Sequence, residues 1–132
     1  MARRPTIPPE QWRDPRQIRG LRGEHQAIAF LSASGWKLEA HRFKVGRHDV
    51  DLVMRRGRLV AFVEVKTRTS ATFGTGREAV GWRKRRTLMQ LGEVWRQRHG
   101  LPDDLYRFDV VEVVDTPSGP PAITHVPDAW RG

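Results

Sequence analysis

The chain contains no cysteine, no long hydrophobic run and comparatively few acidic residues. The absence of cysteine excludes disulfide bonds and thiolate metal ligands. No apolar stretch approaches the roughly 20 residues that a membrane-spanning helix requires, and the first residues lack the apolar segment of a secretory signal. We therefore expect a cytoplasmic protein that does not enter a membrane.

The shortage of acid leaves a strongly basic protein. The 132 residues include 24 Lys and Arg against 15 Asp and Glu, which gives a formal net charge of +9. Such a surface attracts polyanions, and each phosphate that a cation neutralises releases counterions. Nucleic acid, with DNA preferred, is the partner that this charge favours. An anionic membrane surface or an acidic protein is a weaker alternative.

The length predicts one domain. Residues 1–19 hold four of the nine prolines and five arginines, and we interpret them as a flexible N-terminal arm before a single domain at residues 20–132. Apolar periodicity predicts a helix over residues 21–34, with Leu21, Ala27, Ile28 and Leu31 on its inward side, and another over residues 78–98. The inward stripe predicted for the second helix consists of Val80, Leu88, Leu91 and Trp95.

Five strands are predicted, over residues 36–45, 48–55, 58–67, 106–114 and 122–126. The first three form an antiparallel meander, and the first of them lies at or near an edge. The order of elements predicts an α/β fold whose mixed sheet combines the meander with the later strands and is flanked by the two main helices.

Charged residues interrupt the apolar strands of the segment DVDLVMRRGRLVAFVEVKTR, residues 49–68. A two-residue turn at Arg56-Gly57 would place Asp49 opposite Glu64 and Asp51 opposite Phe62. Because side chains alternate along a strand, the charged residues of the hairpin would then share one face: Asp49, Asp51, Glu64 and Lys66. A further acid, Glu24, lies within the apolar stripe of the first predicted helix.

Two explanations account for such charges. They can form a buried ion-pair network, with Lys66 and nearby arginines neutralising the acids, although such networks seldom add stability. Alternatively, the carboxylates can hold Mg²⁺ or Mn²⁺, whose ligand shell substrate phosphates complete. Across the hairpin, Asp51 and Glu64 would then supply ligands, and Lys66 would orient water or neutralise charge at phosphorus. Together with the basic surface, this spacing favours phosphodiester hydrolysis.

The pattern Asp51…Glu64-Val65-Lys66 resembles the PD-(D/E)XK nuclease superfamily. Within it, residues 20–130 look most like the YraN-like family of small uncharacterised bacterial proteins, which are described as distantly related to archaeal Holliday junction resolvases. The segments that carry the resemblance are Gly20-Leu21-Arg22-Gly23-Glu24, Asp49-Val50-Asp51-Leu52, Phe62-Val63-Glu64-Val65-Lys66-Thr67-Arg68, Lys84 and Arg107-Phe108-Asp109-Val110-Val111.

The resemblance implies a restriction-endonuclease-like core and a Mg²⁺- or Mn²⁺-dependent endonuclease acting on nucleic acid, branched DNA included. Asp51 and Glu64 would hold the metal, Lys66 would be catalytic, and Glu24 would be an additional acid near the metal. The family commonly has Gly-Glu-Ile-Asp where this chain has His48-Asp49-Val50-Asp51, so the terminal acid is retained while His48 and Asp49 depart from the pattern. Since resolvase relatives act as dimers, a homodimer is worth testing.

Further contacts to nucleic acid are expected from Arg68, Lys84 and Arg107, for which ordinary surface charge or pairing with Asp109 is the alternative. Trp82 and Phe73 could stack on unpaired bases, although core packing more often explains a helical Trp. Two other function classes stay open. One is a non-catalytic nucleic-acid-binding module on the same fold, and the other is a basic adaptor for an acidic protein.

Overall fold

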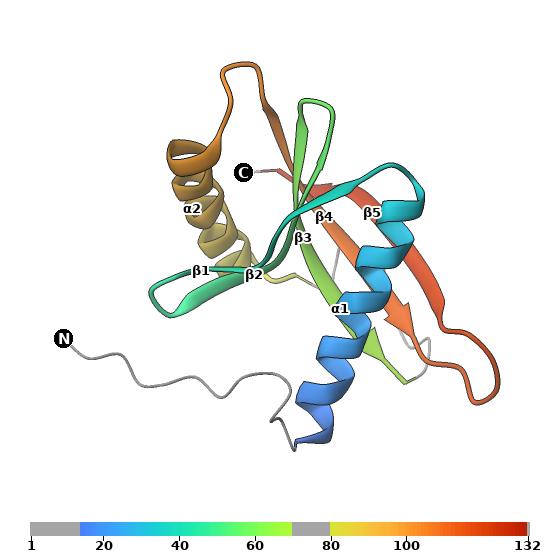
Figure 1. The fold of residues 1–132 in the computed structure, drawn as a ribbon. Coiled ribbons are helices and arrows are strands. Elements are labelled where there is room, and N and C mark those ends of the chain that lie inside the picture. The colour runs from blue at the N-terminus through green and yellow to red at the C-terminus, as the bar shows by residue number, and fades with distance from the viewer. Residues whose placement is uncertain (1–13, 70–79, 132) are drawn as a thin grey trace.

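The fold is a mixed α/β sandwich in three layers. The computed structural model describes residues 14–69 and 80–131 (Figure 1). Its elements are α1 (Pro15–Ala33), β1 (Lys37–Val45), β2 (His48–Arg56), β3 (Leu59–Arg68), α2 (Trp82–His99), β4 (Leu105–Val114) and β5 (Ala122–Trp130). Among these residues, no helix is long and apolar enough to cross a membrane.

The sheet is mixed, as predicted. Its strand order is β1-β2-β3-β4-β5, with β3 and β4 parallel and every other neighbouring pair antiparallel. The helix α2 connects the two parallel strands, as parallel neighbours require. This five-stranded mixed sheet with two main helices agrees with a restriction-endonuclease-like core.

The two helices cover opposite faces of the sheet (Figure 1). Leu88, Leu91 and Trp95 of α2 pack in a core cluster that includes Phe62. Ala27 and Leu31 of α1 belong to a second cluster, which includes the next residue of β3, Val63. Because neighbouring residues of a strand point to opposite faces, β3 is buried from both sides. The inward residues predicted for α2, including Val80 just before the helix, are all buried.

The first helix begins earlier than predicted. It starts at Pro15, so residues 15–19 of the predicted arm are helical, while residues 1–13 lie outside the described part of the chain. Proline suits the first helical position because its missing N–H has no partner there in any case. At the other end Gly35, with φ +89°, and Trp36 donate to the carbonyls of Ser32 and Leu31. This is the Schellman pattern that ends a helix at glycine.

The predicted register of the β2–β3 hairpin is wrong by two residues. Arg56 pairs with Leu59, so the turn consists of Gly57 and Arg58. Glycine occupies the first loop position with φ +64°, where a type II′ turn needs positive φ. The predicted pairings of Asp49 with Glu64 and of Asp51 with Phe62 therefore do not occur.

The shifted register brings Asp51 and Glu64 to the same level of the sheet. The last pair of the β2–β3 ladder is Leu52 with Val63, and these two acids are the next residue on each strand. Both carboxylates therefore lie where the two strands stop pairing. This is closer than the diagonal that the sequence predicts.

Candidate functional site

Just beyond the last pair of the β2–β3 ladder, the carboxylate of Asp51 replaces a main-chain hydrogen-bond acceptor. Its Oδ2 accepts a hydrogen bond from the main-chain N–H of Val65, at 2.8 Å. A main-chain hydrogen bond from Asp51 in turn acts on the carboxylate of Glu64. Side chains thus replace the cross-strand partners that continued pairing would supply, and this holds the two carboxylates beside each other.

The neighbouring strand bends at the same level. Arg42 of β1 has a left-handed φ of +59° and lies between His41, which pairs with Leu52, and Phe43, which pairs with Val50. Val50 packs in the cluster on the α2 side, whereas Leu52 packs in the cluster on the α1 side. Strict alternation, from which the four charged hairpin residues were predicted to share a face, therefore fails at Asp51. The β1–β2 hairpin consequently leaves the plane of the sheet (Figure 1).

Burial makes the charged form of this acid pair costly. The Glu64 side chain is buried at 4% exposure, and its Oε1 has no hydrogen-bond partner among the described residues. Burial, followed by the charge of Asp51, raises the pKa of Glu64 to about 7. Burial likewise raises the pKa of the half-buried Asp51 to about 6, against the lowering effect of the Val65 hydrogen bond. At both carboxyls the effect of burial outweighs that of the nearby positive charges.

Two lysines reach this pair from different elements. Lys84, in the first turns of α2, donates to the main-chain oxygen of Asp49 at 3.1 Å, and its charge lowers the pKa of both Asp51 and Glu64. Lys66, two residues beyond Glu64 on β3, also lowers the pKa of Glu64. Both carboxylates therefore lie within electrostatic range of one ammonium group, and Glu64 lies within range of two.

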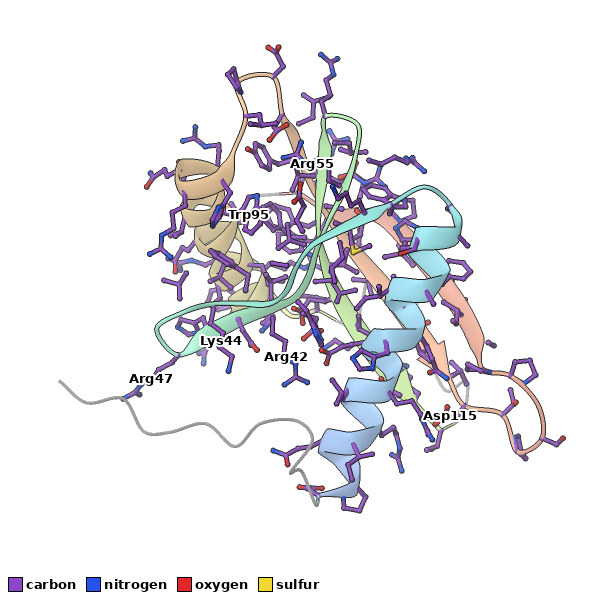
Figure 2. The ribbon with its side chains drawn as sticks, viewed as in Figure 1. Arg42, Lys44, Arg47, Arg55, Trp95 and Asp115 are labelled. Carbon is purple, nitrogen blue, oxygen red and sulfur yellow. The ribbon has the colours of Figure 1, made fainter. Side chains whose placement is uncertain are left out.

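Glu24 lies near the pair but is already paired. Its buried carboxylate accepts two hydrogen bonds from Arg42, each 2.9 Å long, and contacts Nε2 of His41 at 2.6 Å. The charge of Glu24 raises the pKa of Asp51, so the two acids interact electrostatically as neighbours. Arg42 is labelled below the β1–β2 hairpin in Figure 2.

A close helix–strand contact positions Glu24. A Cβ at Gly23 would collide with the hydroxyl of Thr67 on β3. Only glycine at this position lets α1 approach the strand that carries Glu64 and Lys66 so closely. Gly23 thus allows the close contact between α1 and β3, and this contact fixes the position of the next residue, Glu24.

The remaining predicted contact residues have partners of their own. Arg68 pairs with Glu112 at 3.3 Å. Arg107 donates two hydrogen bonds to Asp109, at 2.9 and 3.0 Å, which is the pairing that the sequence left as an alternative. His48 is exposed and borders a small hollow with α2 residues such as Thr87 and Leu91.

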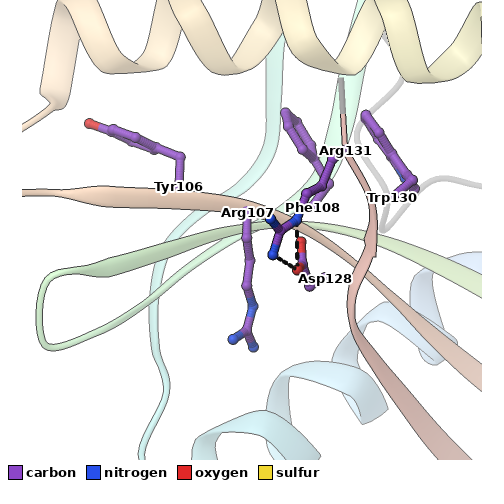
Figure 3. A pocket seen from close by; sticks show the side chains of 6 residues that line it. All are labelled: Tyr106, Arg107, Phe108, Asp128, Trp130 and Arg131. Carbon is purple, nitrogen blue, oxygen red and sulfur yellow. Dashed lines mark hydrogen bonds and ion pairs between the residues drawn. The ribbon is translucent and has the colours of Figure 1, made fainter.

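Arg107 also belongs to the lining of an aromatic hollow on its strand, but its side chain extends away from the aromatic rings. Figure 3 shows Tyr106, Phe108 and Trp130 on the α2 side of β4, with Arg107 directed toward the opposite side. The hollow measures about 520 Å³ and is bordered by the ion pair of Arg131 with Asp128. It lies apart from Asp51 and Glu64, neither of which lines it.

Sequence reasoning missed His41 and Arg42, the two residues that hold Glu24. The sequence around them, EAHRFKV, reads as an ordinary irregular edge strand. A left-handed φ is uncommon for arginine, and nothing local to the sequence signals it. The function of His41 and Arg42 follows only from the contact between α1 and β1, which brings Glu24 to these two residues.

The donor set at the end of the ladder suits a divalent cation. Two carboxylates with raised pKa values and one buried, unpartnered oxygen are hard oxygen ligands whose burial a cation would offset. A complete protein cage is not formed, because residues 14–69 and 80–131 contain no group of three His, Asp or Glu side chains arranged to hold a metal. Mg²⁺ ordinarily retains waters and takes substrate phosphates as further ligands, so two carboxylates are a sufficient protein contribution.

Comparisons with known proteins identify the relatives of this chain. The sequence profile of the uncharacterised protein family UPF0102 matches residues 23–113. A UPF0102 protein of Nocardia farcinica is 38% identical over 111 residues, covering 84% of this chain and 87% of that protein. A UPF0102 protein of Anaeromyxobacter dehalogenans is 38% identical over 119 residues, covering 90% of this chain and 88% of its own length. The matched segment includes Glu24, Asp51, Glu64 and Lys66.

Proposed function

The chain belongs to the uncharacterised protein family UPF0102, which is the YraN-like family that its motifs predict, and we propose that it is a divalent-metal-dependent nuclease. The observation that carries the proposal is the Asp51–Glu64 pair with its unpartnered Glu64 oxygen, next to Lys66 and Lys84. The proposed reaction is hydrolysis of a phosphodiester bond in nucleic acid, with DNA as the first substrate to test.

Two groups of this chain would hold the cation, namely the carboxylates of Asp51 and Glu64. When bound, Mg²⁺ or Mn²⁺ would polarise the scissile phosphate and lower the pKa of a bound water. The role of Glu24 in this proposal is that of an auxiliary acid. Its carboxylate is held by Arg42 and His41 and contributes negative charge beside Asp51.

The lysines would act on the phosphate. The ammonium group of Lys66 would offset the negative charge that develops on the phosphate oxygens as water adds, and Lys84 would hold the phosphate from the α2 side. Hydrolysis forms one P–O bond from water and breaks one ester P–O bond. The departing ester oxygen takes up one proton, and the second proton of water goes to solvent.

The substrate proposal follows from charge. A formal net charge of +9 favours a polyanion, and a nucleic acid offers many phosphates along one chain. Branched DNA and a homodimeric protein, which the resemblance to resolvases implies, belong to the same proposal. Arg68 and Arg107 support phosphate binding less strongly than the lysines do, because each arginine already has an acidic partner.

A specific observation favours a second candidate, a non-catalytic nucleic-acid-binding module. Glu24 is fully paired, and the described residues hold no three-ligand group. A protein of this second kind would bind nucleic acid in a salt-dependent way and would retain binding when Asp51 and Lys66 are replaced.

Calorimetric titration with Mn²⁺ tests the cation site before any substrate is chosen. We expect wild type to give a binding isotherm that Asp51→Asn and Glu64→Gln lose. The matched control is Glu93→Gln, which removes one exposed acid of α2. An identical isotherm for wild type and Asp51→Asn would exclude the proposed site.

Cleavage assays then test the reaction. Purified protein with Mg²⁺ or Mn²⁺ is incubated with duplex, single-stranded and branched DNA and with RNA. Cleavage by wild type that disappears in Asp51→Asn supports the nuclease proposal. Intact substrates in all arms, together with salt-dependent binding that Asp51→Asn retains, support the second candidate.

A further inference from the structure

Trp82 is the exception among the described tryptophans. Its side chain is 62% exposed, whereas Trp36, Trp95 and Trp130 are at most 6% exposed. A single exposed apolar residue is common on protein surfaces, so its exposure alone points to no ligand. The groups around Trp82 are what distinguish it.

The indole forms one wall of a positively charged hollow. Trp82, Arg83 and Arg86, with Thr87 and Gln90, line a space of about 290 Å³ beside the start of α2. The guanidinium of Arg83 lies 5.5 Å from the centre of the indole ring. Among the described residues, no acidic side chain lines this hollow. We call the three residues Trp82, Arg83 and Arg86 the Trp82 shelf.

The chemistry of the shelf matches a nucleotide. An aromatic face is a stacking partner for any nucleobase, and planar guanidinium groups donate paired hydrogen bonds to phosphate oxygens. A membrane surface would favour several apolar anchors around the cations, whereas Trp82 is the one apolar side chain that lines this hollow in the described part of the chain. An acidic protein would pair with the arginines and would gain little from an exposed indole ring beside them.

The shelf and the Asp51–Glu64 pair are linked through the first turns of α2. Trp82 precedes Lys84 by two residues, a rise of about 3 Å along the helix axis. Lys84 contacts the main-chain oxygen of Asp49 and acts on both carboxylates. Because successive helical residues point about 100° apart, Trp82 and Arg86 share one side of α2, and Lys84, about 200° away around the helix, points toward the acids from the other side.

We propose that the Trp82 shelf stacks an unpaired base of the bound nucleic acid, so that the preferred substrate contains a single-stranded segment. The inference rests on the proposed nucleic-acid function and adds the substrate class to it. In an intact duplex both faces of each internal base are already stacked, and none is offered to the indole. An unpaired nucleotide presents its base to Trp82 and its phosphate to Arg83 and Arg86.

Binding without metal tests the shelf separately from cleavage. Fluorescence anisotropy in EDTA compares a labelled single strand of DNA, the same sequence as RNA, and a DNA dumbbell duplex with closed ends. We expect Trp82→Ala to weaken binding of the single strands about 5- to 100-fold, and of the dumbbell less than about twofold. Trp82→Phe should retain most of the affinity. Leu105→Ala, which removes another exposed apolar side chain, is the matched control.

The arginines provide a second readout. Arg83→Ala and Arg86→Ala should weaken binding of all three ligands and each reduce the salt slope by about one. Tryptophan emission of wild type should be quenched by the single strand, and Trp82→Phe should lose that quenching. Equal losses on DNA and RNA identify the base face as the recognised group, and a larger loss on one identifies that nucleic acid as the substrate.

The outcomes separate this inference from the nuclease proposal. If Trp82→Ala weakens the dumbbell and the single strands equally, or weakens neither, the shelf inference is wrong even where wild type cleaves DNA. If wild type cleaves nothing but the loss remains selective for single strands, the shelf stands and the nuclease proposal falls. If wild type binds none of the ligands, both fall.

Discussion

Two buried acids of this protein have opposite electrostatic environments. Asp109 on β4 is 1% exposed and Glu64 on the neighbouring strand β3 is 4% exposed, so both have lost nearly all contact with water. Burial acts to raise the pKa of Asp109, but hydrogen bonds from His125, Arg107 and the Asp128 main chain outweigh it, and the pKa is lowered. The pKa of Glu64 is raised to about 7.

The difference lies in partners and not in burial. Asp109 accepts hydrogen bonds from Arg107, from the main chain of Asp128 at 3.0 Å, and contacts His125 Nε2 at 2.7 Å. It thereby ties β4 to β5 with its charge fully compensated. Glu64 has an unpartnered buried oxygen. Removing a buried acid that has a complete set of partners leaves those partners uncompensated. A buried acid without a complete set disfavours the fold at neutral pH and can take a further ligand.

The largest expected effect concerns the rate of the proposed cleavage reaction at the acid pair that contains Glu64. If the proposed nuclease reaction holds, Lys66→Met should lower the rate of DNA cleavage by about 10²–10³-fold, because it removes the charge proposed to stabilise the transition state. Mn²⁺ affinity should change little, since Asp51 and Glu64 remain. Single-turnover cleavage and calorimetry of the same variant measure the two effects. Unchanged cleavage by Lys66→Met would remove this lysine from the mechanism.

Replacing the fully paired acid should damage the fold. Asp109→Ala is expected to lower the free energy of unfolding by about 3–5 kcal/mol, because it leaves Arg107 and His125 without their shared partner. Urea denaturation followed by circular dichroism measures the change. A loss below about 1 kcal/mol would mean that the hydrogen bonds of Asp109 contribute little to stability. The contrast between a structural acid, Asp109, and a ligand-binding acid, Glu64, would then fail.

Replacing the unpaired acid should have the opposite sign. In EDTA at pH 8, Glu64→Gln is expected to raise the free energy of unfolding by roughly 1–3 kcal/mol, because the charge that burial disfavours is removed. Mn²⁺ should then raise the melting temperature of wild type and leave that of Glu64→Gln unchanged. Destabilisation by Glu64→Gln without metal would show that the Asp51 hydrogen bond and the lysine charges outweigh the cost of burying the carboxylate.

The smallest effect is a slope of stability with pH. The folded-state pKa of Glu64, about 7, exceeds the ordinary value of 4.5 for a glutamate, so the folded protein binds more protons than the unfolded chain between these pH values. This group's contribution to stability is therefore lost as pH rises through that window, by at most about 1.4 kcal/mol per pH unit. Urea denaturation at several pH values should show a flatter profile for Glu64→Gln than for metal-free wild type.

Much of the fold was predictable because it depends on neighbouring residues. Apolar periodicity identified both helices and all five strands, and the buried positions Ala27, Leu31, Leu88, Leu91 and Trp95 follow from it. Gly35 and Gly57 mark a helix end and a turn, since each has a positive φ that glycine adopts without strain. The register was wrong because the residue pattern did not decide whether Gly57 takes the first or the second loop position.

The sequence by itself determined that acids and lysines would be threaded through a buried hairpin, because strand periodicity and turn chemistry are local. Only the tertiary structure decided which acids obtain partners. His125 reaches Asp109 across neighbouring strands, and Arg42 reaches Glu24 through a left-handed backbone. The solvation of a buried charge depends on groups that folding brings from distant parts of the chain. Spacing along the chain therefore could not distinguish Asp109, whose carboxylate has a complete set of partners, from Glu64, which keeps a buried oxygen without a partner among the described residues.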